Sequence, residues 1–270
     1  MKREKIALFD LDNTISHLRD GWEESLGILG RYLLGDTPWL NEFKAYVSTA
    51  DGLPSIKHIQ KLCEIYKRST AGSELDPKST FNVYYASRVA TVERRINEFK
   101  DTSTSYRLQK FGVPGVEKVL ERLKRLGFRI AIVTTSSLLE ASRTLEFLGL
   151  QSLIYKTYAG LRDKVNFASS PLGDYIILSV KDKRDIVMVG DTPSDIGLAK
   201  VLGIKSIGIA HRATVAESTK RANQLYEAGA DIVLINYLEF MQAFNTLRGV
   251  RTYARPLVTA FRKPLSSLVR

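Results

Sequence analysis

The chain has 270 residues, of which 44% are hydrophobic and 26% are charged, a composition typical of a globular protein with a buried core. Cys63 is the only cysteine, which excludes an intramolecular disulfide and a disulfide-stapled secreted fold. No apolar run approaches the ~20 residues of a membrane-spanning helix, and the apolar segment that begins at Ile6 is too short for the core of a signal peptide. These features predict a cytoplasmic protein.

Positive charge is concentrated at the end of the chain. The formal net charge is +11, and residues 245–270 hold six Lys or Arg residues and no acid. Apolar residues recur there at roughly helical intervals, although Pro256 and Pro264 would break a continuous helix. A basic extension of this kind can bind nucleic acid or an acidic membrane surface, and the plainer alternative is that it packs along the core.

Six short apolar segments predict strands, and several are followed by helical patterns. The expected strands are Lys5–Phe9, Arg129–Val133, Leu153–Tyr158, Asp185–Val189, Lys205–Ala210 and Asp231–Ile235. Continuous apolar runs are typical of strands that are buried on both faces of a parallel sheet. Helical periodicity is clearest at 116–126 and 138–148, each followed by a glycine. The alternation predicts an α/β fold with an open, Rossmann-like parallel sheet.

Residues 17–107 interrupt this alternation of strands and helices. They lack convincing strands and carry helical patterns, such as Ile56, Ile59 and Cys63. We therefore expect an α/β core formed by residues 1–16 and 108–244, with an inserted all-α domain at 17–107 and the extension at 245–270.

Two of the predicted strands run directly into acidic clusters. Asp10 and Asp12 follow the first strand, and Asp191 and Asp195 follow the fourth. Open α/β sheets bind ligands at the carboxyl ends of their strands, and alternation places Asp10 and Asp12 on one side of an extended segment. Grouped carboxylates are costly at the edge of a core unless a cation binds them, and Mg²⁺ prefers oxygen ligands. The alternative is a set of ordinary turn and helix-cap aspartates.

Four segments, in the expected order, resemble the motifs of the haloacid dehalogenase superfamily. They are Asp10–Thr14 (DLDNT), Ile130–Thr134 (IAIVT), the single residue Lys164, and Gly190–Asp195 (GDTPSD). The resemblance reaches to about Phe244 and is to phosphoglycolate phosphatase-like members, in which glycine is usual at the position of Asn13. It implies a magnesium-dependent phosphohydrolase.

The resemblance also implies roles for the acidic residues. Asp10 would be the nucleophile that forms an aspartyl-phosphate, and Asp12 would protonate the leaving oxygen and then activate water. Magnesium would be held by Asp10, the backbone carbonyl of Asp12, and Asp191, while Asp195 would order a metal-bound water or the catalytic lysine. Dehalogenases and phosphonatases of the superfamily lack an acid at the position of Asp12, so that residue favours a phosphatase, although mutases retain it.

Phosphate recognition would come from the second and third motifs. Thr134 would hydrogen-bond a phosphoryl oxygen, with Thr135 as a neighbouring candidate, and Lys164 would neutralise the nucleophile and the phosphate. Lys156 and Lys181 are competing candidates for the catalytic lysine, and a solvated surface lysine is the alternative at Lys164.

The helical insert resembles the cap of this superfamily, which closes over the active site. The loop that contains Gly52 is either a cap loop that contacts substrate or an ordinary interhelical turn. His17 and Arg19 are candidates for substrate contact or for a polar hinge, while His58 and His211 are expected to be structural or at the surface. No His or Cys grouping has the spacing of zinc ligands.

Three functions are consistent with the sequence. The first is hydrolysis of a small phosphorylated metabolite, and the second is phosphoryl transfer within a sugar phosphate by a mutase. The third is a binding protein whose basic extension, 245–270, contacts nucleic acid or an acidic membrane.

Overall fold

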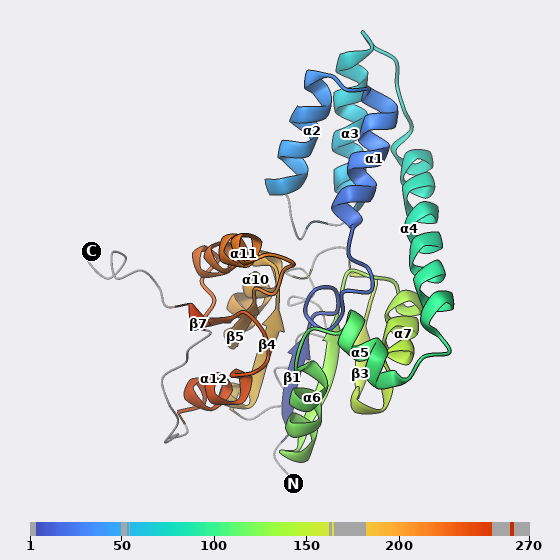
Figure 1. The fold of residues 1–270 in the computed structure, drawn as a ribbon. Coiled ribbons are helices and arrows are strands. Elements are labelled where there is room, and N and C mark those ends of the chain that lie inside the picture. Colours follow the sequence, from blue (N-terminus) through green and yellow to red (C-terminus); the bar gives the residue numbers. More distant parts are fainter. Residues whose placement is uncertain are drawn as a thin grey trace, which may run out of the picture. The chain divides into compact units, whose positions relative to one another are not determined.

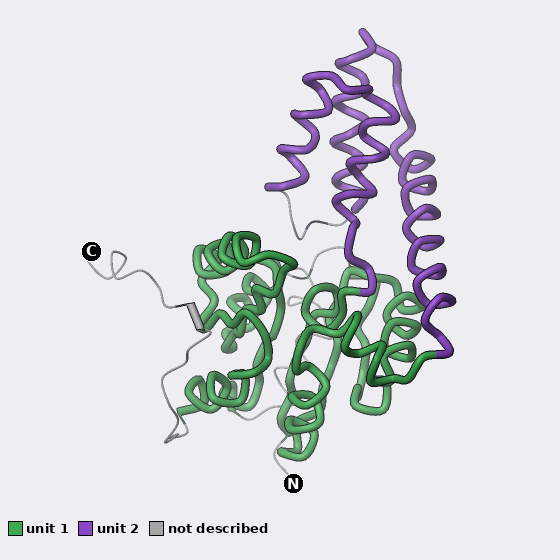
Figure 2. Tube along the Cα trace, viewed as in Figure 1, with its two compact units in different colours: residues 1–17, 102–270 green, residues 18–101 purple. Residues whose placement is uncertain are grey.

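The computed structural model describes residues 4–49, 53, 55–161, 164, 182–249 and 260–261. The chain forms two compact units, one of residues 1–17 and 102–270 (the core unit) and one of residues 18–101 (the helical unit). Figure 2 colours the two units separately. Among the described residues, no helix is long and apolar enough to cross a membrane.

The core unit is built on a seven-stranded sheet with the order β3-β2-β1-β4-β5-β6-β7 (Figure 1). The strands β1 to β6 run parallel to one another, and β7 is antiparallel to β6. The strands are β1 (Lys5–Phe9), β2 (Phe128–Val133), β3 (Lys156–Tyr158), β4 (Ile186–Gly190), β5 (Lys205–Ile209), β6 (Ile232–Leu234) and β7 (Ala260–Phe261). The predicted open parallel sheet is therefore confirmed.

The central strands are buried along almost their whole length because helices cover the sheet. Every residue of β4 is buried, and so are all residues of β1 except Lys5. The covering helices of the core unit are α5 (Thr104–Phe111), α6 (Val116–Arg125), α7 (Leu138–Phe147), α10 (Pro193–Leu202), α11 (Val215–Glu227) and α12 (Phe240–Leu247). Burial on both faces explains why these strands read as continuous apolar runs.

Local sequence signals fix where the predicted helices begin. The helix α6 follows Gly115, which has a φ of +87° and packs directly against Tyr237. The helix α7 starts with a capping box, in which Ser137 and Glu140 exchange side-chain-to-backbone hydrogen bonds. Both helices lie where the periodicity predicted them.

Two predicted segments differ from the structure. The third strand begins at Lys156, because Gln151–Leu153 forms a short 3-10 turn instead of extended chain. In the C-terminal extension, where apolar residues recur at helical intervals, Ala260–Phe261 forms β7 and pairs with β6. An edge strand offers unpaired backbone groups that can bind such a segment, and the rest of 250–270 lies outside the described residues.

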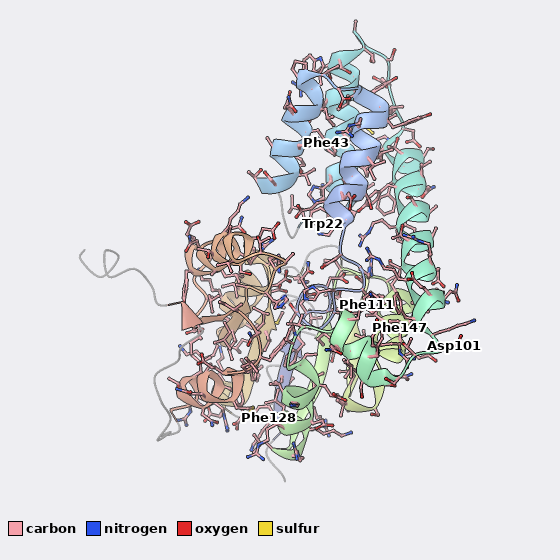
Figure 3. All side chains as sticks on the ribbon, in the orientation of Figure 1. Trp22, Phe43, Asp101, Phe111, Phe128 and Phe147 are labelled. Atoms are coloured by element: carbon pink, nitrogen blue, oxygen red, sulfur yellow. The ribbon has the colours of Figure 1, made fainter. Side chains whose placement is uncertain are left out.

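The helical unit consists of α1 (Trp22–Leu34), α2 (Pro38–Thr49), α3 (Ser55–Ser69) and α4 (Pro77–Phe99). Phe43, labelled in Figure 3, is fully buried among these helices. The helices α1 and α2 meet closely at Gly30, where a Cβ would lie 2.8 Å from Cδ1 of Phe43. Glycine is thus required for this close packing.

His58 is a buried titratable group in this helical core. It lies between Trp22 and Tyr46, with ring-centroid distances of 5.2 and 5.7 Å. Burial lowers the pKa of His58 from 6.5 to about 4, with the Leu53 backbone opposing the shift. The folded helical unit therefore favours the neutral imidazole.

We predict that the helical unit loses stability as the pH falls from about 6.5 towards 4. Over that range the unfolded chain binds a proton at His58 that the folded chain does not, so protonation favours unfolding. Urea unfolding followed by tryptophan fluorescence tests this, because both tryptophans, Trp22 and Trp39, lie in the helical unit. The free energy of unfolding should fall more steeply with pH in the wild type than in His58→Phe, and parallel pH profiles would contradict the prediction.

Candidate active site

The two acidic clusters meet at the carboxyl edge of the sheet. Asp10 follows β1 and Asp191 follows β4, and these strands are adjacent and parallel, with Phe9 opposite Val189. The backbone N–H of Asp10 donates to the carbonyl of Val189 at 2.9 Å. Carboxylate oxygens of Asp10, Asp191 and Asp195 all lie within 4.8 Å of one another, and all three residues are buried.

Lys164 joins this cluster. Its Nζ donates to Oδ1 of Asp10 at 2.6 Å and to Oδ1 of Asp195 at 2.7 Å, and the side chain is buried. The competing Lys156 lies on β3 with an exposed side chain, its Nζ 5.1 Å from the centre of the Tyr158 ring. Lys181 lies outside the described residues.

The position of Asp195 is fixed by the N-terminal capping box of α10. Its Oδ2 accepts hydrogen bonds from the backbone N–H and the hydroxyl of Thr192, at 3.0 and 2.7 Å, while its Oδ1 accepts the Lys164 ammonium. A Cβ at Gly190 would overlap the Asp195 side chain, so the glycine at the end of β4 makes room for this carboxylate. Asp195 therefore completes the capping box of α10 with one oxygen and accepts the Lys164 ammonium with the other.

Burial has the largest single effect on the pKa values of Asp10 and Asp191. It raises the pKa of Asp10 well above its usual value, against the opposing charge of Lys164, and the neighbouring aspartates raise it further. Burial likewise raises the pKa of Asp191, with Arg212 opposing the shift. Burial alone would lower the pKa of Lys164, but the charges of Asp10 and Asp195 outweigh it and raise that pKa. The site thus favours additional positive charge.

Asp12 lies beside the second predicted motif rather than in the carboxylate cluster. Its Oδ2 accepts a hydrogen bond from the hydroxyl of Ser136 at 2.8 Å. The chain turns immediately afterwards, since Asn13 has a φ of +58°, a conformation that asparagine tolerates better than most residues. Two acids that are neighbours in the sequence therefore have different partners.

Thr134 and Thr135 have different environments at the end of β2. Thr134 is buried, its backbone N–H donates to the carbonyl of Tyr158 at 2.9 Å, and its Oγ1 accepts from the N–H of Ser136 at 3.1 Å. Because a hydroxyl carries one proton to donate, that proton of Thr134 can be directed to a ligand. Thr135 is exposed. Gly52 lies outside the described residues.

Four further residues of the site were not recognised in the sequence. Ser136 holds Asp12, and Arg212 donates from Nη2 to Oδ2 of Asp191 at 2.7 Å. Thr14 donates to Oδ1 of Asp191 at 3.3 Å, and the Tyr237 hydroxyl donates to the carbonyl of Thr14 at 2.8 Å. Thr14 lies in the first motif, and Arg212 follows β5. Because open α/β sheets bind ligands at the carboxyl ends of their strands, both residues could have been recognised as site candidates. Nothing in the sequence singled out Tyr237.

The histidines divide between the two units. The rings of His17 and His211 lie 4.9 Å apart in the core unit, and Nδ1 of His17 is 3.1 Å from Oδ1 of Asn13. Arg19 is buried in the helical unit. His17 thus contacts a residue of the first motif, while His58 belongs to the helical core.

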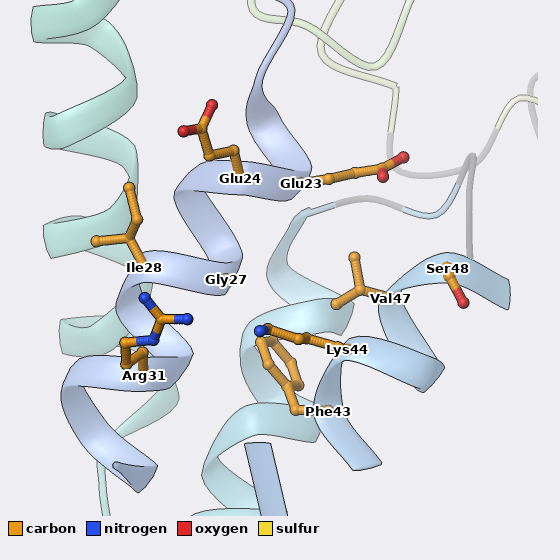
Figure 4. A pocket seen from close by; sticks show the side chains of 9 residues that line it. All are labelled: Glu23, Glu24, Gly27, Ile28, Arg31, Phe43, Lys44, Val47 and Ser48. Atoms are coloured by element: carbon orange, nitrogen blue, oxygen red, sulfur yellow. The ribbon is translucent and has the colours of Figure 1, made fainter. Parts of the chain in front are cut away.

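The helical unit has a groove of its own, of about 410 Å³ (Figure 4). Phe43 and Val47 line it together with charged side chains, among them Glu23, Arg31 and Lys44. Unlike the edge of the sheet, this open groove has no cluster of buried carboxylates. The cluster of buried carboxylates therefore lies in the core unit.

A model of the haloacid dehalogenase-like hydrolase family matches residues 7–209. The chain belongs to this family. The resemblance inferred from the four motifs is thereby confirmed. None of the curated proteins compared with the chain is significantly similar to it in sequence.

Solved structures share the fold of this hydrolase. A predicted phosphoglycolate phosphatase from Haemophilus somnus 129pt is 16% identical, with a TM-score of 0.61 over 90% of this chain and 99% of that one. A phosphonoacetaldehyde hydrolase-like protein from Oleispira antarctica is 12% identical, with a TM-score of 0.66 over 92% and 93% of the two chains. A provisionally named β-phosphoglucomutase from Thermotoga maritima is 20% identical, with a TM-score of 0.55 over 90% and 99%. At these identities the likeness shows the fold alone.

We predict that Tyr237→Phe lowers the free energy of unfolding by about 1 kcal/mol, because the buried carbonyl of Thr14 loses its donor. Urea unfolding at neutral pH measures the difference. Tyr32→Phe is a suitable control, since Tyr32 is 85% exposed and should leave stability unchanged. Equal stability of Tyr237→Phe and the wild type would contradict the proposed anchoring of the first motif.

Proposed function

We propose that this hydrolase is a magnesium-dependent phosphatase that hydrolyses a small phosphate monoester through an aspartyl-phosphate on Asp10. The observation that carries the proposal is the buried position of Asp10, within 4.8 Å of two other carboxylates and 2.6 Å from the Lys164 ammonium. A carboxylate held in this way can attack phosphorus while cations neutralise the phosphoryl oxygens.

The donor set of the cluster fits magnesium. Asp10 and Asp191 offer carboxylate oxygens, which are the ligands that this hard cation prefers, and the backbone carbonyl of Asp12 is the proposed third ligand. Magnesium bound there would supply positive charge that keeps the buried carboxylates ionised and balances the charge of the phosphoryl group. Asp195 is better suited to hold Lys164, because its two oxygens already accept from Lys164 and Thr192.

The first chemical step divides between Asp10 and Asp12. Because Lys164 already engages Oδ1 of Asp10, we propose that Oδ2 attacks phosphorus. As that O–P bond forms, the bond from phosphorus to the leaving oxygen breaks, and Asp12 donates a proton to that oxygen. Ser136 holds the Asp12 carboxylate by Oδ2 and so orients it for this transfer. The products are the free alcohol and a phosphoryl group on Asp10.

Hydrolysis of the intermediate reverses the role of Asp12. Asp12, now ionised, accepts a proton from a water molecule that attacks phosphorus, and the bond between Asp10 and phosphorus breaks to release phosphate. Lys164 and the Thr134 hydroxyl are proposed to bind the phosphoryl oxygens in both steps. Both side chains are buried, and the Thr134 oxygen already accepts from Ser136, which leaves its proton to donate.

The helical unit is proposed to act as a cap over this site and to supply contacts to the leaving group. Such a role would place substrate selectivity in residues 18–101, with Gly52 as a proposed substrate contact. The proposed substrate is a small phosphorylated metabolite, and the proposed location of the protein is the cytoplasm.

Asp10→Asn is predicted to lose magnesium-dependent phosphatase activity by a factor on the order of 10⁴, because an amide cannot act as the nucleophile. A screen of phosphorylated metabolites, with and without Mg²⁺, identifies a substrate and then compares the variants by released phosphate. Asp231→Asn is the matched control, since Asp231 pairs with the half-exposed Lys205 at the opposite end of β5. Full activity of Asp10→Asn would refute the nucleophile assignment, and an isomerised sugar phosphate without free phosphate would identify a mutase instead.

Lys164→Ala is predicted to lower kcat by roughly 10²- to 10³-fold and to raise KM, because the variant loses a buried donor beside the transferring phosphoryl group. The matched control is Lys156→Ala, which removes the exposed competing lysine on β3. Steady-state kinetics should leave the control close to the wild type. The opposite ranking of the two variants would move the catalytic role from Lys164 to Lys156.

A further inference from the structure

Arg212 lies at the edge of the candidate metal site without belonging to any of the four motifs. It follows β5, which pairs with β4, so it reaches the same edge of the sheet as Asp191. Its Nη2 donates to Oδ2 of Asp191 at 2.7 Å, with the arginine side chain 17% exposed and the aspartate 2% exposed. This is a largely desolvated ion pair on a carboxylate that is also expected to bind metal.

Contacts other than the ion pair hold the arginine in this place. Its backbone N–H donates to Oγ of Ser218 in α11 at 3.1 Å, and its Nη1 donates to the carbonyl of His211 at 2.6 Å. Ser218 is itself buried. A capping box formed by Thr214 and Glu217 fixes the start of α11. Contacts with His211 and with α11 therefore hold Arg212 beside Asp191.

The charge of Arg212 acts on the same carboxylate as a bound cation would. Three buried carboxylates lie within 4.8 Å of one another, and Lys164 contacts Asp10 and Asp195. Asp191 is paired with Arg212 instead. A divalent cation and a guanidinium that share one carboxylate repel each other, and the repulsion is strong where water is excluded.

We propose that Arg212 is a built-in counter-cation that stabilises the metal-free site by partly neutralising Asp191 and thereby weakens the binding of divalent cations. The inference rests on the proposed magnesium site. It assigns to Arg212 a control of metal affinity that is separate from the chemistry at Asp10. Removing the guanidinium should tighten Mg²⁺ binding while making the metal-free protein less stable.

The chain offers a matched control at the other end of β4. Arg248 donates from Nη2 to Oδ1 of Asp185 at 2.8 Å, with side chains 23% and 4% exposed. Asp185 precedes β4, whereas Asp191 follows it, so the two ion pairs lie at opposite ends of one strand. They are similar in burial and geometry, but Asp185 is not part of the carboxylate cluster.

The test is calorimetric titration of Mg²⁺ into metal-free, full-length protein, combined with thermal unfolding in EDTA and in Mg²⁺. Arg212→Gln should bind Mg²⁺ about tenfold more tightly than the wild type, have a lower Tm in EDTA, and gain more in Tm from Mg²⁺. Arg248→Gln should also have a lower Tm in EDTA but bind Mg²⁺ with wild-type affinity. A merely structural role of Arg212 would lower Tm without tightening metal binding.

Each of the following results would overturn the inference. Unchanged or weaker Mg²⁺ binding by Arg212→Gln would contradict it directly, and so would equal tightening in Arg248→Gln. If the wild type bound no Mg²⁺, the proposed metal site itself would fail. Should Arg212→Gln not fold, Arg212→Met provides the test, since it removes the charge but keeps a long, flexible, unbranched side chain. It should also bind Mg²⁺ more tightly than the wild type, and unchanged or weaker binding would contradict the inference.

Discussion

The site depends on the cost of burying several carboxylates at one edge of a sheet. Asp10, Asp191 and Asp195 lie close enough to share a ligand and are almost completely withdrawn from solvent. Such a group is unstable unless positive charge compensates it. Within the described residues Lys164 supplies that charge to Asp10 and Asp195, and Arg212 supplies it to Asp191. The same requirement makes this edge of the sheet suitable for a divalent cation.

Strand pairing, two special backbone positions and single hydrogen bonds maintain this arrangement. The adjacent parallel strands β1 and β4 bring Asp10 and Asp191 to one edge. Gly190 leaves space for Asp195, and the positive φ of Asn13 turns the chain so that Asp12 meets Ser136. The Tyr237 hydroxyl holds the first motif from a distant part of the chain. Each acid thereby obtains its own partners, which suits different roles in one reaction.

Much of this could be predicted from sequence because it depends on local signals. Buried strands are continuous apolar runs, and the acids that follow them must gather where parallel strands end. The position of Arg212 after β5 could have indicated that it lies at this edge. The contacts of Ser136 and Tyr237 could not be predicted, because each joins segments whose meeting depends on strand order and loop conformation. Similarly, β7 pairs with β6 through its backbone, whereas the sequence around it shows only side-chain spacing. Lys164 was predicted from its place in the motif order, and in the structure its ammonium contacts Asp10 and Asp195.

The most direct test of the account is a crystal structure of the protein grown with Mn²⁺ in place of Mg²⁺, with the ion located by anomalous scattering. The account predicts one buried ion in contact with the carboxylates of Asp10 and Asp191, at about 2.0–2.2 Å from its oxygen ligands. Lys164 should remain on Asp10 in that structure. An ion bound elsewhere, or none at this edge of the sheet at saturating Mn²⁺, would contradict the claim that these carboxylates form a metal centre.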